Sequence, residues 1–596
     1  MGFNADLHSR LDEMARLLEL TGANRFRVNA FARAARAVES QPRDLSTLEE
    51  KDLVSIDGIG KGIASFIREF ADSGSVTELE ALRKDVPAGL AGVLDIQGLG
   101  PKTVRLMWQD LGITDRASLK KAIDDGSILS LPRMGEKTVE NIKTALTFAS
   151  KSNERLALGI AAPIADALID RMKAVKGVKQ CAFAGSLRRG KDTIGDIDIL
   201  VSTTNPEAAA EAFCEADNVK QVIARGETKC SVRLAVKSNS ARWKSDGKLP
   251  PTVGADLRIV PDNAFGAALL YFSGSKEHNI RLRERALKKG LTLNEYGLFP
   301  EDTSTTESPQ SRGVKPVAAK TEEAVYTKLG MPYIPPEIRE DAGELDLKET
   351  PELIEVEDIK SDLHAHTTAS DGKMSLHELI QCAIDRGFHT MAVTDHSKSS
   401  VQAGGLSVER LRAQRDEIEE ARKHFGKKIT ILAGSEVDIL ADGSLDYDDE
   451  ILAWLDIVVA SPHAALSQDT KAATKRLLKA IEHPNVNIIG HPTGRLINRR
   501  KGLEPAMDEI IAAAVEHDTA LEINAHWMRL DLRDTHVRAA AEAGCKIAID
   551  CDDHAPTDFD NIRFGIATAR RGWLTPELCV NTWTPKKLHN WLKKKR

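Results

Sequence analysis

Short apolar runs alternate with helical segments from about residue 358 to the C-terminus, and this alternation limits the possible folds more than any other feature. The runs are TMAVTDH, ITILAGSEVDI, DIVVASPH, VNIIGHPT, TALEINAH and KIAIDCDDH, with segments such as LRAQRDEIEEARKHF between them. Alternating strands and helices favour a parallel sheet whose outer face is covered by helices. We therefore expect an α/β barrel-like domain in the last third of the chain.

Many residues at the ends of these runs can bind metal ions. A single histidine on an apolar run is usually a core or surface residue, but six histidines and three carboxylates at successive strand ends are typical of a metal centre. Imidazole and carboxylate ligands together suit Zn²⁺, Mn²⁺ or Fe²⁺. The candidate ligands are His364, His366, Asp371, His396, Glu436, His463, His491, Asp552 and His554.

A second group of acidic residues lies in GDIDIL, residues 195–200. In a strand, Asp196 and Asp198 point to the same face, where their like charges repel. Divalent cations would neutralise them, and Asp256 in the strand-like ADLRIV offers a third carboxylate. Oxygen ligands of this kind suit Mg²⁺, and two such ions can stabilise both oxygens in phosphoryl transfer. Upstream, FAGSLRRG places Arg188 and Arg189 where they could hold a triphosphate.

Residues 1–150 are expected to be helical and contain a repeated glycine turn. The copies are IDGIGKGIASFI (56–67), IQGLGPKTVRLM (96–107) and LPRMGEKTVENI (131–142). Each places exposed amides at the start of a helix, which is a site for phosphate groups. This helix-hairpin-helix pattern predicts binding to a nucleic-acid backbone without base reading. The third copy has one turn glycine, Gly135, and could be structural only.

Composition limits the remaining classes of protein. The 596 residues are enough for three to five domains, and the net charge of −7 excludes a globally basic nucleic-acid binder. The first residues do not resemble a signal peptide, and no apolar run is long enough to span a membrane. The seven cysteines include no CxxC pair, so a reduced, cytoplasmic protein is expected and a zinc finger is not.

The motifs GSLRRG, GDIDIL, ADLRIV, YFSGSKEHN (271–279) and LNEYGL (293–298) resemble the nucleotidyltransferase core of family X DNA polymerases. The resemblance extends through the hairpins to the N-terminus. It implies that Asp196, Asp198 and Asp256 hold Mg²⁺ or Mn²⁺, with Asp256 nearest the primer 3′-OH. It also implies contacts to the triphosphate by Ser186, Arg189 and Gly195, to the sugar by Tyr271, Phe272 and Gly274, to the base by Asn279, to the template by Arg283, and to the DNA backbone by Gly58, Gly60, Gly98, Gly100 and Lys102.

The first hairpin departs from part of this family. Some members carry a lysine there that forms a Schiff base and excises a deoxyribose phosphate. Alignment of GIGKGIASF places Phe66 at the position of that lysine, and phenylalanine cannot form an imine. We therefore expect no such lyase activity unless Lys61 replaces the missing lysine.

The sequence DLHAHTTASDG (362–372) and the nine candidate ligands resemble the PHP (polymerase and histidinol phosphatase) domain. This resemblance implies a distorted β/α barrel with up to three Zn²⁺, Mn²⁺ or Fe²⁺ ions. Asp395 would support the ligands, and Arg495 and Arg529 would contact substrate phosphates. The stretch EINAHWMRLDL departs from the family by placing His526 and Trp527 where Asn-Pro is usual.

A family X core joined to a PHP domain is the arrangement of bacterial and archaeal PolX proteins. The expected fold is multidomain, with an all-α helix-hairpin-helix region, an α+β nucleotidyltransferase core and a C-terminal distorted (β/α)7-type barrel. The expected domains are 1–80 (helical, with a hairpin), 81–150 (fingers-like), 151–262 (palm), 263–335 (thumb-like), 336–357 (linker) and 358–596 (PHP).

The expected function is template-directed gap filling in DNA repair, combined with metal-dependent 3′-5′ exonuclease activity. The expected partners are gapped or primed double-stranded DNA and dNTPs, and the protein is expected to act as a monomer near the nucleoid, without a membrane. Two alternatives remain open. The PHP domain could be a phosphatase for small phosphoesters, or the chain could be a repair scaffold. The twelve candidate ligands argue against a scaffold.

Overall fold

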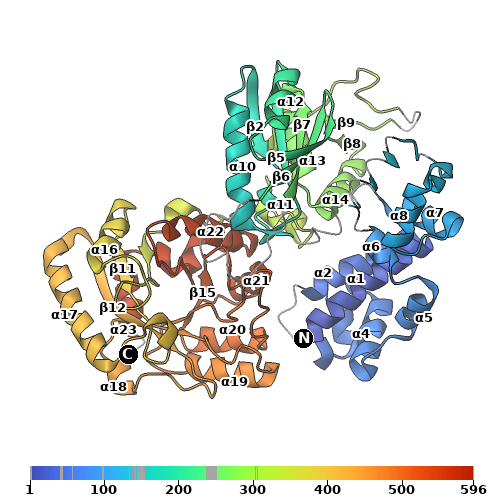
Figure 1. The fold of residues 1–596 in the computed structure, drawn as a ribbon. Helices are drawn as coiled ribbons and strands as arrows, with labels where there is room; N and C mark the ends of the chain where they lie inside the picture. Colours follow the sequence, from blue (N-terminus) through green and yellow to red (C-terminus); the bar gives the residue numbers. More distant parts are fainter. Residues whose placement is uncertain are drawn as a thin grey trace. The chain divides into compact units, whose positions relative to one another are not determined.

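The chain divides into two compact units, residues 1–154 and 155–596, and each is described by itself (Figure 1). The structure is a computed structural model. It describes residues 3–594 apart from 40–44, 57, 95, 97–98, 133, 137, 140–141, 144–145, 147–154, 237–251, 303 and 305–306.

The first unit is helical, as expected, and contains two apolar cores. One core joins Leu7, Phe31 and Phe66, whereas the other joins Leu90, Val104 and further residues up to 146. Its helices are α1 (Phe3–Thr21), α2 (Arg25–Glu39), η1 (Leu45–Thr47), α3 (Glu50–Val54), α4 (Lys61–Ser73), α5 (Thr77–Asp85), α6 (Leu90–Leu94), α7 (Pro101–Leu111), α8 (Arg116–Asp124) and η2 (Ser127–Ser130).

The second unit begins with a five-stranded sheet in the order β2-β4-β7-β6-β5, in which β4 and β7 are parallel. Ile197 and Ile199 pack with α10 and α12 on one face of the sheet. Leu200 packs with Phe265 of α13 on the other face. Because side chains alternate along a strand, Asp196 and Asp198 point away from α10 and α12.

The elements of this core and of the thumb-like region follow in chain order. They are β1 (Leu156–Ala157), α10 (Leu158–Lys173), β2 (Val178–Phe183), α11 (Gly185–Arg188), β3 (Thr193–Ile194), β4 (Asp196–Thr203), α12 (Pro206–Cys214), β5 (Val219–Arg225), β6 (Lys229–Ala235), β7 (Thr252–Val260), η4 (Asp262–Ala264), α13 (Phe265–Ser273), α14 (Lys276–Leu287), β8 (Leu291–Asn294), β9 (Gly297–Pro300), α15 (Glu322–Lys328), η5 (Pro336–Ile338), η6 (Glu344–Asp346) and η7 (Val356–Asp358).

Residues 336–357, which the sequence predicts to be a linker, pack closely against the thumb-like region. Ile338, Leu345 and Leu353 belong to its apolar core. Arg339 is fully buried and donates to Glu322 of α15. The acidic, proline-bounded composition of this segment predicts an inter-domain connection, and the structure buries its apolar residues in the core of the thumb-like region.

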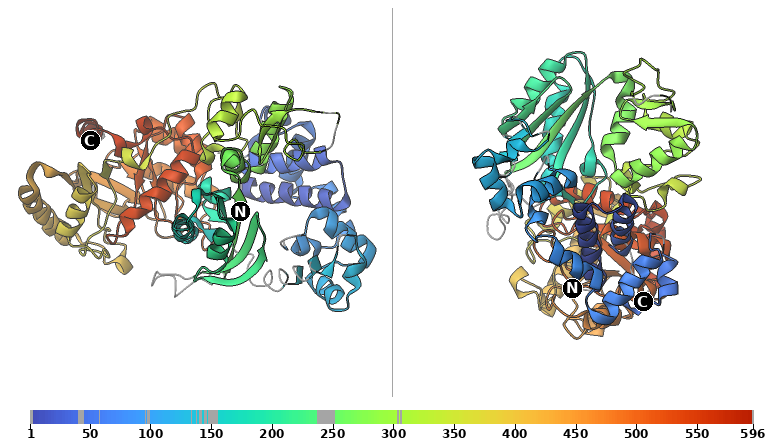
Figure 2. Two further views of the ribbon diagram at one scale, coloured as in Figure 1. Left: turned by 90° about the horizontal axis from the view of Figure 1, so that it is seen from above. Right: turned by 90° about the vertical axis from the view of Figure 1, so that its right-hand side faces the viewer.

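The C-terminal domain is a barrel of seven parallel strands in sequential order, with helices around it (Figure 2). Each of the six apolar runs identified in the sequence contains one of its strands. The elements are β10 (Ser361–Asp362), α16 (Leu376–Asp385), β11 (Thr390–Val393), η8 (Val401–Ala403), α17 (Val408–Phe425), η9 (Gly426–Lys428), β12 (Thr430–Asp438), α18 (Asp449–Leu452), β13 (Ile457–Ser461), α19 (Thr470–Ile481), β14 (Ile488–Ile489), α20 (Met507–Glu516), β15 (Ala520–Asn524), α21 (Asp534–Glu542), β16 (Ile547–Asp550), η10 (Asp558–Asn561), α22 (Ile562–Arg571), η11 (Pro576–Leu578), η12 (Val580–Thr582) and α23 (Pro585–Lys594).

The first and last strands of the barrel form no continuous ladder. A single parallel bridge joins Ala365 to Asp553, and the Leu363 N–H donates to Asp550. Inside the barrel, Leu432 and other strand residues pack against Trp591 of α23, so the C-terminal helix covers one end. None of the helices within the described ranges is long and apolar enough to cross a membrane.

Candidate active sites

The three predicted catalytic aspartates lie on the neighbouring strands β4 and β7. Asp198 is the register partner of Asp256, and Asp196 lies two residues before Asp198 on the same face. Asp196 is exposed and Asp198 is half-buried. The strand register therefore places Asp256 next to the Asp196 and Asp198 pair, as the sequence predicts.

Burial and mutual repulsion both act on these carboxylates. Burial, followed by the Asp196 and Asp256 carboxylates, raises the pKa of Asp198 to about 7. A Cβ on Gly185 would lie 2.2 Å from Oδ2 of Asp198, so only glycine fits beside this carboxylate. Gly185 also has a φ of +62°, which glycine adopts without strain. Carboxylates that gain protons when forced together are suited to binding divalent cations.

Asp256 has protein partners on the neighbouring strand β6. Its Oδ2 lies 2.8 Å from Nζ of Lys229, and its Oδ1 accepts a hydrogen bond of 2.6 Å from Ser231. The three aspartates do not form a group whose ligand atoms all lie within 4.8 Å of one another. Binding of a cation by all three would therefore require at least one of these carboxylates to move.

The predicted triphosphate-binding loop follows directly after the Asp198 contact. Ser186 lies in α11, and Arg189 follows that helix. The Arg189 Nε lies 3.0 Å from Oε1 of Glu340, and Arg189 also donates to the carbonyl of Ser273. Arg188 makes two hydrogen bonds, of 2.8 and 2.6 Å, to Glu322. Both arginines thus have carboxylate partners. The Glu340 side chain that pairs with Arg189 is 22% exposed, whereas the Glu322 side chain that pairs with Arg188 is 5% exposed.

Glu340 links this loop to the C-terminal domain. Arg571 of α22 lies 2.9 Å from Glu340 and also donates to the carbonyl of Arg189. Lys191 lies 3.7 Å from the same carboxylate. Burial opposes the shift, but the three surrounding cations lower the pKa of Glu340 to about 2. Glu340 is therefore an anion held by the cations that would also attract a triphosphate.

The remaining predicted nucleotide contacts lie near the start of α14. A Cβ on Gly274 would lie 3.0 Å from Nη1 of Arg189, so this glycine is next to the loop predicted to bind the triphosphate. Asn279 donates to the carbonyl of Tyr271 at 2.7 Å. The guanidinium of Arg258 lies 4.9 Å from the ring centre of Phe272. The structure brings these segments together with Arg189, whereas Gly195 directly precedes β4 and contacts Arg155.

The hairpin glycines precede helices, as the sequence predicts. Gly60 and Gly100 are the N-caps of α4 and α7, and nothing lies within 4 Å of a Cβ built on either. Gly58 has a φ of +90°. Lys102 is exposed in the first turn of α7, whereas Gly98 lies outside the described residues. The helix starts on both hairpins are thus open to a ligand.

Two further residues bear on the DNA and lyase predictions. Arg283 lies on α14, where its Nε donates to the carbonyl of Asn279. Phe66 is buried in the first helical core and contacts the ring of Phe31 edge-on, with centroids 5.4 Å apart. Lys61 is exposed at the start of α4. A buried phenylalanine therefore occupies the position where the family places its lysine.

All nine predicted ligands of the C-terminal domain gather at one end of the barrel. They form four overlapping groups, and within each group the ligand atoms lie within 4.8 Å of one another. The groups are His366, Asp371, His396 and His554; His364, Glu436 and His491; His364, His366 and Asp552; and His396, Glu436 and His463.

Glu436 lies at the centre of this arrangement. Its oxygens are 3.2 Å from Nε2 of His463 and 2.8 Å from Nδ1 of His396. The Nε2 atoms of His463 and His491 are only 3.1 Å apart. Several of these buried atoms lack a hydrogen-bond partner, including both oxygens of Glu436 and Nε2 of His364. Burying such oxygen and nitrogen atoms without hydrogen bonds is costly. Their convergence is therefore consistent with a site where they coordinate metal ions.

Two acidic residues that the sequence analysis did not identify orient these ligands. Glu522 on β15 accepts a hydrogen bond of 2.6 Å from Nδ1 of His364 and one of 2.5 Å from the His491 N–H. Asp438 on β12 bonds Nδ1 of His463. The bonds to Nδ1 of His364 and of His463 leave Nε2 of each ring facing the centre, whereas the bond to His491 is made by its backbone N–H. Both could have been found, since Asp438 lies two residues after Glu436 and Glu522 interrupts an apolar strand.

Asp395 supports the loop before Asp371 rather than a histidine ring. Its oxygens accept hydrogen bonds of 2.9 Å from the Thr367 N–H and 3.2 Å from the Ser370 N–H. Gln414 also donates to it. This carboxylate therefore positions the backbone that carries Asp371.

The metal-ligand cluster opens into a cavity of about 690 Å³, large enough for a nucleotide. Arg529 lines it, 3.7 Å from Asp552, as expected for a phosphate contact. Arg495 does not line this cavity, because its guanidinium is buried, bonds to the Arg529 and Leu530 carbonyls and lies 3.2 Å from Asp192. His526 also lines the cavity, and burial lowers its pKa to about 4.

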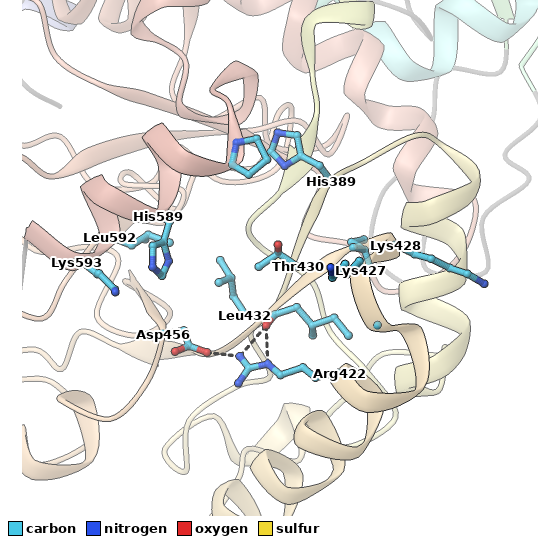
Figure 3. A pocket seen from close by; sticks show the side chains of 14 residues that line it. His389, Arg422, Lys427, Lys428, Thr430, Leu432, Asp456, His589, Leu592 and Lys593 are labelled. Atoms are coloured by element: carbon cyan, nitrogen blue, oxygen red, sulfur yellow. Dashed lines mark hydrogen bonds and ion pairs between the residues drawn. The ribbon is translucent and has the colours of Figure 1, made fainter.

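A separate cavity of about 670 Å³ lies at the opposite end of β12, where Thr430 begins the strand (Figure 3). Lys427, Lys428 and Lys593 line it, together with His389 and His589. It contains none of the predicted site residues. The two cavities therefore differ in charge. The cavity at Thr430 is lined by basic side chains, whereas the 690 Å³ cavity is lined partly by the candidate metal ligands.

Comparison with protein families identifies each region. Residues 3–76 match a helix-hairpin-helix domain, 90–147 a SAM-like helix-hairpin-helix tandem, 161–259 the DNA polymerase beta palm, 268–340 the DNA polymerase beta thumb and 362–526 the PHP domain. The thumb match includes residues 336–340, which pack with that region in the structure.

Individual relatives cover the whole chain or parts of it. The DNA polymerase/3′-5′ exonuclease PolX of Bacillus subtilis is 38% identical over 590 residues, which are 99% of each chain. DNA polymerase lambda of Rattus norvegicus is 28% identical over 57% of this chain and 56% of its own length. A probable phosphatase of Thermoanaerobacter is 29% identical over 39% of this chain and 95% of its own length.

Proposed function

Because the chain belongs to the PolX family of DNA polymerases/3′-5′ exonucleases, we propose that it fills short gaps in DNA during repair and processes 3′ ends with its PHP domain. It is a DNA polymerase of family X with an exonuclease domain. The proposed substrates are gapped or primed double-stranded DNA and dNTPs. The protein would act as a monomer, since one chain contains both sites. DNA in the nucleoid would be its place of action.

The observation that carries the polymerase assignment is the register of β4 and β7. It places Asp198 beside Asp256, with Asp196 on the same face. These carboxylates would hold Mg²⁺ or Mn²⁺, which when bound stabilise the charge on the reacting phosphate. Asp256 would face the primer 3′-OH. Ser186 and Arg189 would hold the triphosphate, and Asn279 would contact the base.

Nucleotide binding at this site requires an exchange of partners. Arg189 is paired with Glu340, and Asp256 is paired with Lys229. The triphosphate would compete with Glu340 for Arg189 because both are anions. The incoming nucleotide would thereby weaken a contact that also involves Arg571 of the C-terminal domain.

The exonuclease site would use the nine gathered ligands to hold up to three Zn²⁺, Mn²⁺ or Fe²⁺ ions. The bound ions would activate water and withdraw charge from the scissile phosphate. Arg529 would contact a phosphate in the 690 Å³ cavity. Glu522 and Asp438 would keep the histidine rings oriented toward the ions.

The helical unit would hold the DNA backbone. The N-caps Gly60 and Gly100 leave the amides of α4 and α7 exposed to phosphates, and Lys102 adds a positive charge. Base edges play no part in this kind of contact. Because Phe66 is buried in the core, this unit would bind the DNA near a gap without excising a deoxyribose phosphate.

The direct test is a gapped, 5′-phosphorylated duplex incubated with Mg²⁺ or Mn²⁺, with and without dNTPs. We expect extension to fill the gap when dNTPs are present and shortening of the 3′ end when they are absent. Template-independent addition, or no change in strand length under any metal condition, would contradict the proposal. Borohydride trapping on a 5′-deoxyribose-phosphate end should give no adduct.

The match to a probable phosphatase favours a second candidate for the PHP site, hydrolysis of small phosphoesters. The cavity of about 690 Å³ is large enough for such a compound. Rates on DNA 3′ ends and on nucleoside monophosphates, measured on one preparation, distinguish the two. Preference for the monophosphate would replace the exonuclease assignment and leave the polymerase assignment unchanged.

A further inference from the structure

A fifth group of ligand-type side chains lies in the C-terminal domain and shares no residue with the nine described above. It consists of Asp362, Cys551 and Asp553, whose ligand atoms lie within 4.8 Å of one another. Their exposed fractions are 2%, 1% and 0%. Asp362 ends β10, and the other two residues follow β16, so the group lies where the first and last strands of the barrel meet.

The carboxylate of Asp553 is the unusual member of this group. It is fully buried, neither of its oxygens accepts a hydrogen bond from a nitrogen or hydroxyl donor, and it lies beside the carboxylate of Asp362. No lysine or arginine within the described residues forms an ion pair with Asp362 or Asp553. A buried carboxylate with no cation and no donor is costly, by several kcal/mol in real proteins, so it normally binds a metal ion or carries a proton.

The other two members are held in place by the backbone. Asp362 accepts hydrogen bonds from the N–H groups of His364, at 3.0 Å, and of Cys551, at 3.4 Å. The Cys551 thiol makes only a long contact of 3.6 Å to the carbonyl of Phe559. Both side chains are therefore fixed beside Asp553, and the sulfur atom has no strong competing partner.

We propose that Asp362, Cys551 and Asp553 hold a structural divalent cation of the zinc type, separate from the metal centre of the nine ligands. A thiolate and two carboxylate oxygens form a ligand set that zinc accepts. Bound as a thiolate and two carboxylates, the three side chains would carry three negative charges, of which the divalent ion offsets two. This site does not depend on which reaction the PHP domain catalyses.

The position of the site gives it a structural role. The seam between β10 and β16 is joined by the Ala365–Asp553 bridge, by the Leu363–Asp550 hydrogen bond and by the hydrogen bond from the Cys551 N–H to Asp362. A cation bound from both sides would close this seam. Because Asp362 precedes His364 by two residues and Cys551 adjoins Asp552, the cation would also fix two ligands of the metal centre.

The alternative arrangement is a shared proton. Burial and the Asp362 and Asp558 carboxylates raise the pKa of Asp553 well above its ordinary range. A carboxyl group bonded to a carboxylate would then satisfy both aspartates without a metal ion. This alternative leaves the Cys551 sulfur as a thiol, whereas the metal site requires a thiolate. The sulfur atom therefore distinguishes the two arrangements.

The test is absorption spectroscopy of the full-length protein loaded with Co²⁺. None of the nine ligands of the metal centre is a cysteine, so a thiolate-to-cobalt charge-transfer band in the near ultraviolet reports only the new site. The visible bands of cobalt bound to histidine confirm loading. We expect the near-ultraviolet band in the unaltered protein, its loss in Cys551→Ser, and its retention in the matched control Cys382→Ser, a half-buried cysteine of the same domain.

Metal counting supplies a second measurement that does not depend on Cys551. In protein loaded with Zn²⁺, Asp553→Asn should contain one zinc ion fewer per chain than the unaltered protein, because asparagine removes the charge and keeps the shape. Visible cobalt bands without the near-ultraviolet band in the unaltered protein would overturn the proposal. An unchanged zinc content in Asp553→Asn would also overturn it, and would favour the shared proton.

Discussion

The two proposed active sites differ in how their charged groups are partnered. In the PHP domain nine ligands converge, and several of their buried donor atoms have no hydrogen-bond partner. In the polymerase core the corresponding groups are already paired, with Asp256 bonded to Lys229 and Arg189 to Glu340. In the PHP site the ligand atoms face one another without protein partners, whereas the polymerase site must exchange protein partners for its ligands.

Burial accounts for this difference. His364 and His491 are fully buried, so their positions are set by packing and by Glu522 whether or not an ion is bound. In the polymerase core Asp196 is exposed, and Lys229 has an exposed fraction of 38%, so water can replace its partner Asp256 at lower cost. A site that must admit and release a nucleotide in every cycle benefits from the second arrangement.

The largest expected effect is the separation of the two activities by single substitutions. Asp198→Ala should lower nucleotide addition by at least roughly a thousandfold, because it removes a metal ligand, and should spare the exonuclease. His364→Ala should do the reverse. Primer extension and 3′-end shortening are measured on the same gapped duplex. Loss of both activities in either folded variant would mean that the two sites are not independent.

Removal of free metal should distinguish the sites almost as strongly. After desalting into metal-free buffer, the exonuclease should keep most of its activity because its ions are enclosed by nine preformed ligands. Nucleotide addition should stop until Mg²⁺ or Mn²⁺ is returned. Metal analysis of the desalted protein provides the control. Equal loss of both activities would indicate that the PHP ligands do not retain their ions.

A third prediction concerns the carboxylate that orients the PHP histidines. Glu522→Gln should weaken metal binding or exonuclease activity by about 10- to 100-fold, as found for groups that support metal ligands. Its control is Glu516→Gln, an exposed glutamate at the end of α20. Polymerase activity should not change. If Glu522→Gln behaves like the control, packing alone is sufficient to orient His364.

The pairing of Arg189 gives a smaller expected effect. Glu340→Gln removes the anion that competes with the triphosphate, so the KM for dNTP should fall by about fivefold, while kcat changes little. Because the pKa of Glu340 is about 2, its charge is constant between pH 6 and 9, and the KM ratio of variant to unaltered protein should be constant there too. A higher KM in the variant would instead show that Glu340 orients Arg189 productively.

The sequence predicted the ligands better than their partners. Asp196, Asp198 and the PHP histidines were recognisable because strand periodicity and repeated strand ends bring such residues together. Lys229 and Glu340 were not, because a single lysine on a strand and a glutamate in an acidic segment look like solvated surface. Their roles depend on the strand register and on the packing of 336–357, which no local pattern reports. The contacts of Arg495 could not be predicted for the same reason, since they are made with Asp192 and with two carbonyls more than 30 residues away.

The smallest expected effect tests whether Asp256 is held away from its cation. Lys229→Met should lower the Mg²⁺ concentration for half-maximal extension by about two- to threefold, because a partly exposed ion pair contributes only about 0.2–1 kcal/mol. The control is Lys220→Met, an exposed lysine on β5. The metal dependence of the exonuclease should be the same in all three proteins. A higher Mg²⁺ requirement in Lys229→Met would contradict this prediction and would show that Lys229 positions Asp256 for catalysis. The ion pair would then favour metal binding by Asp256 instead of competing with it.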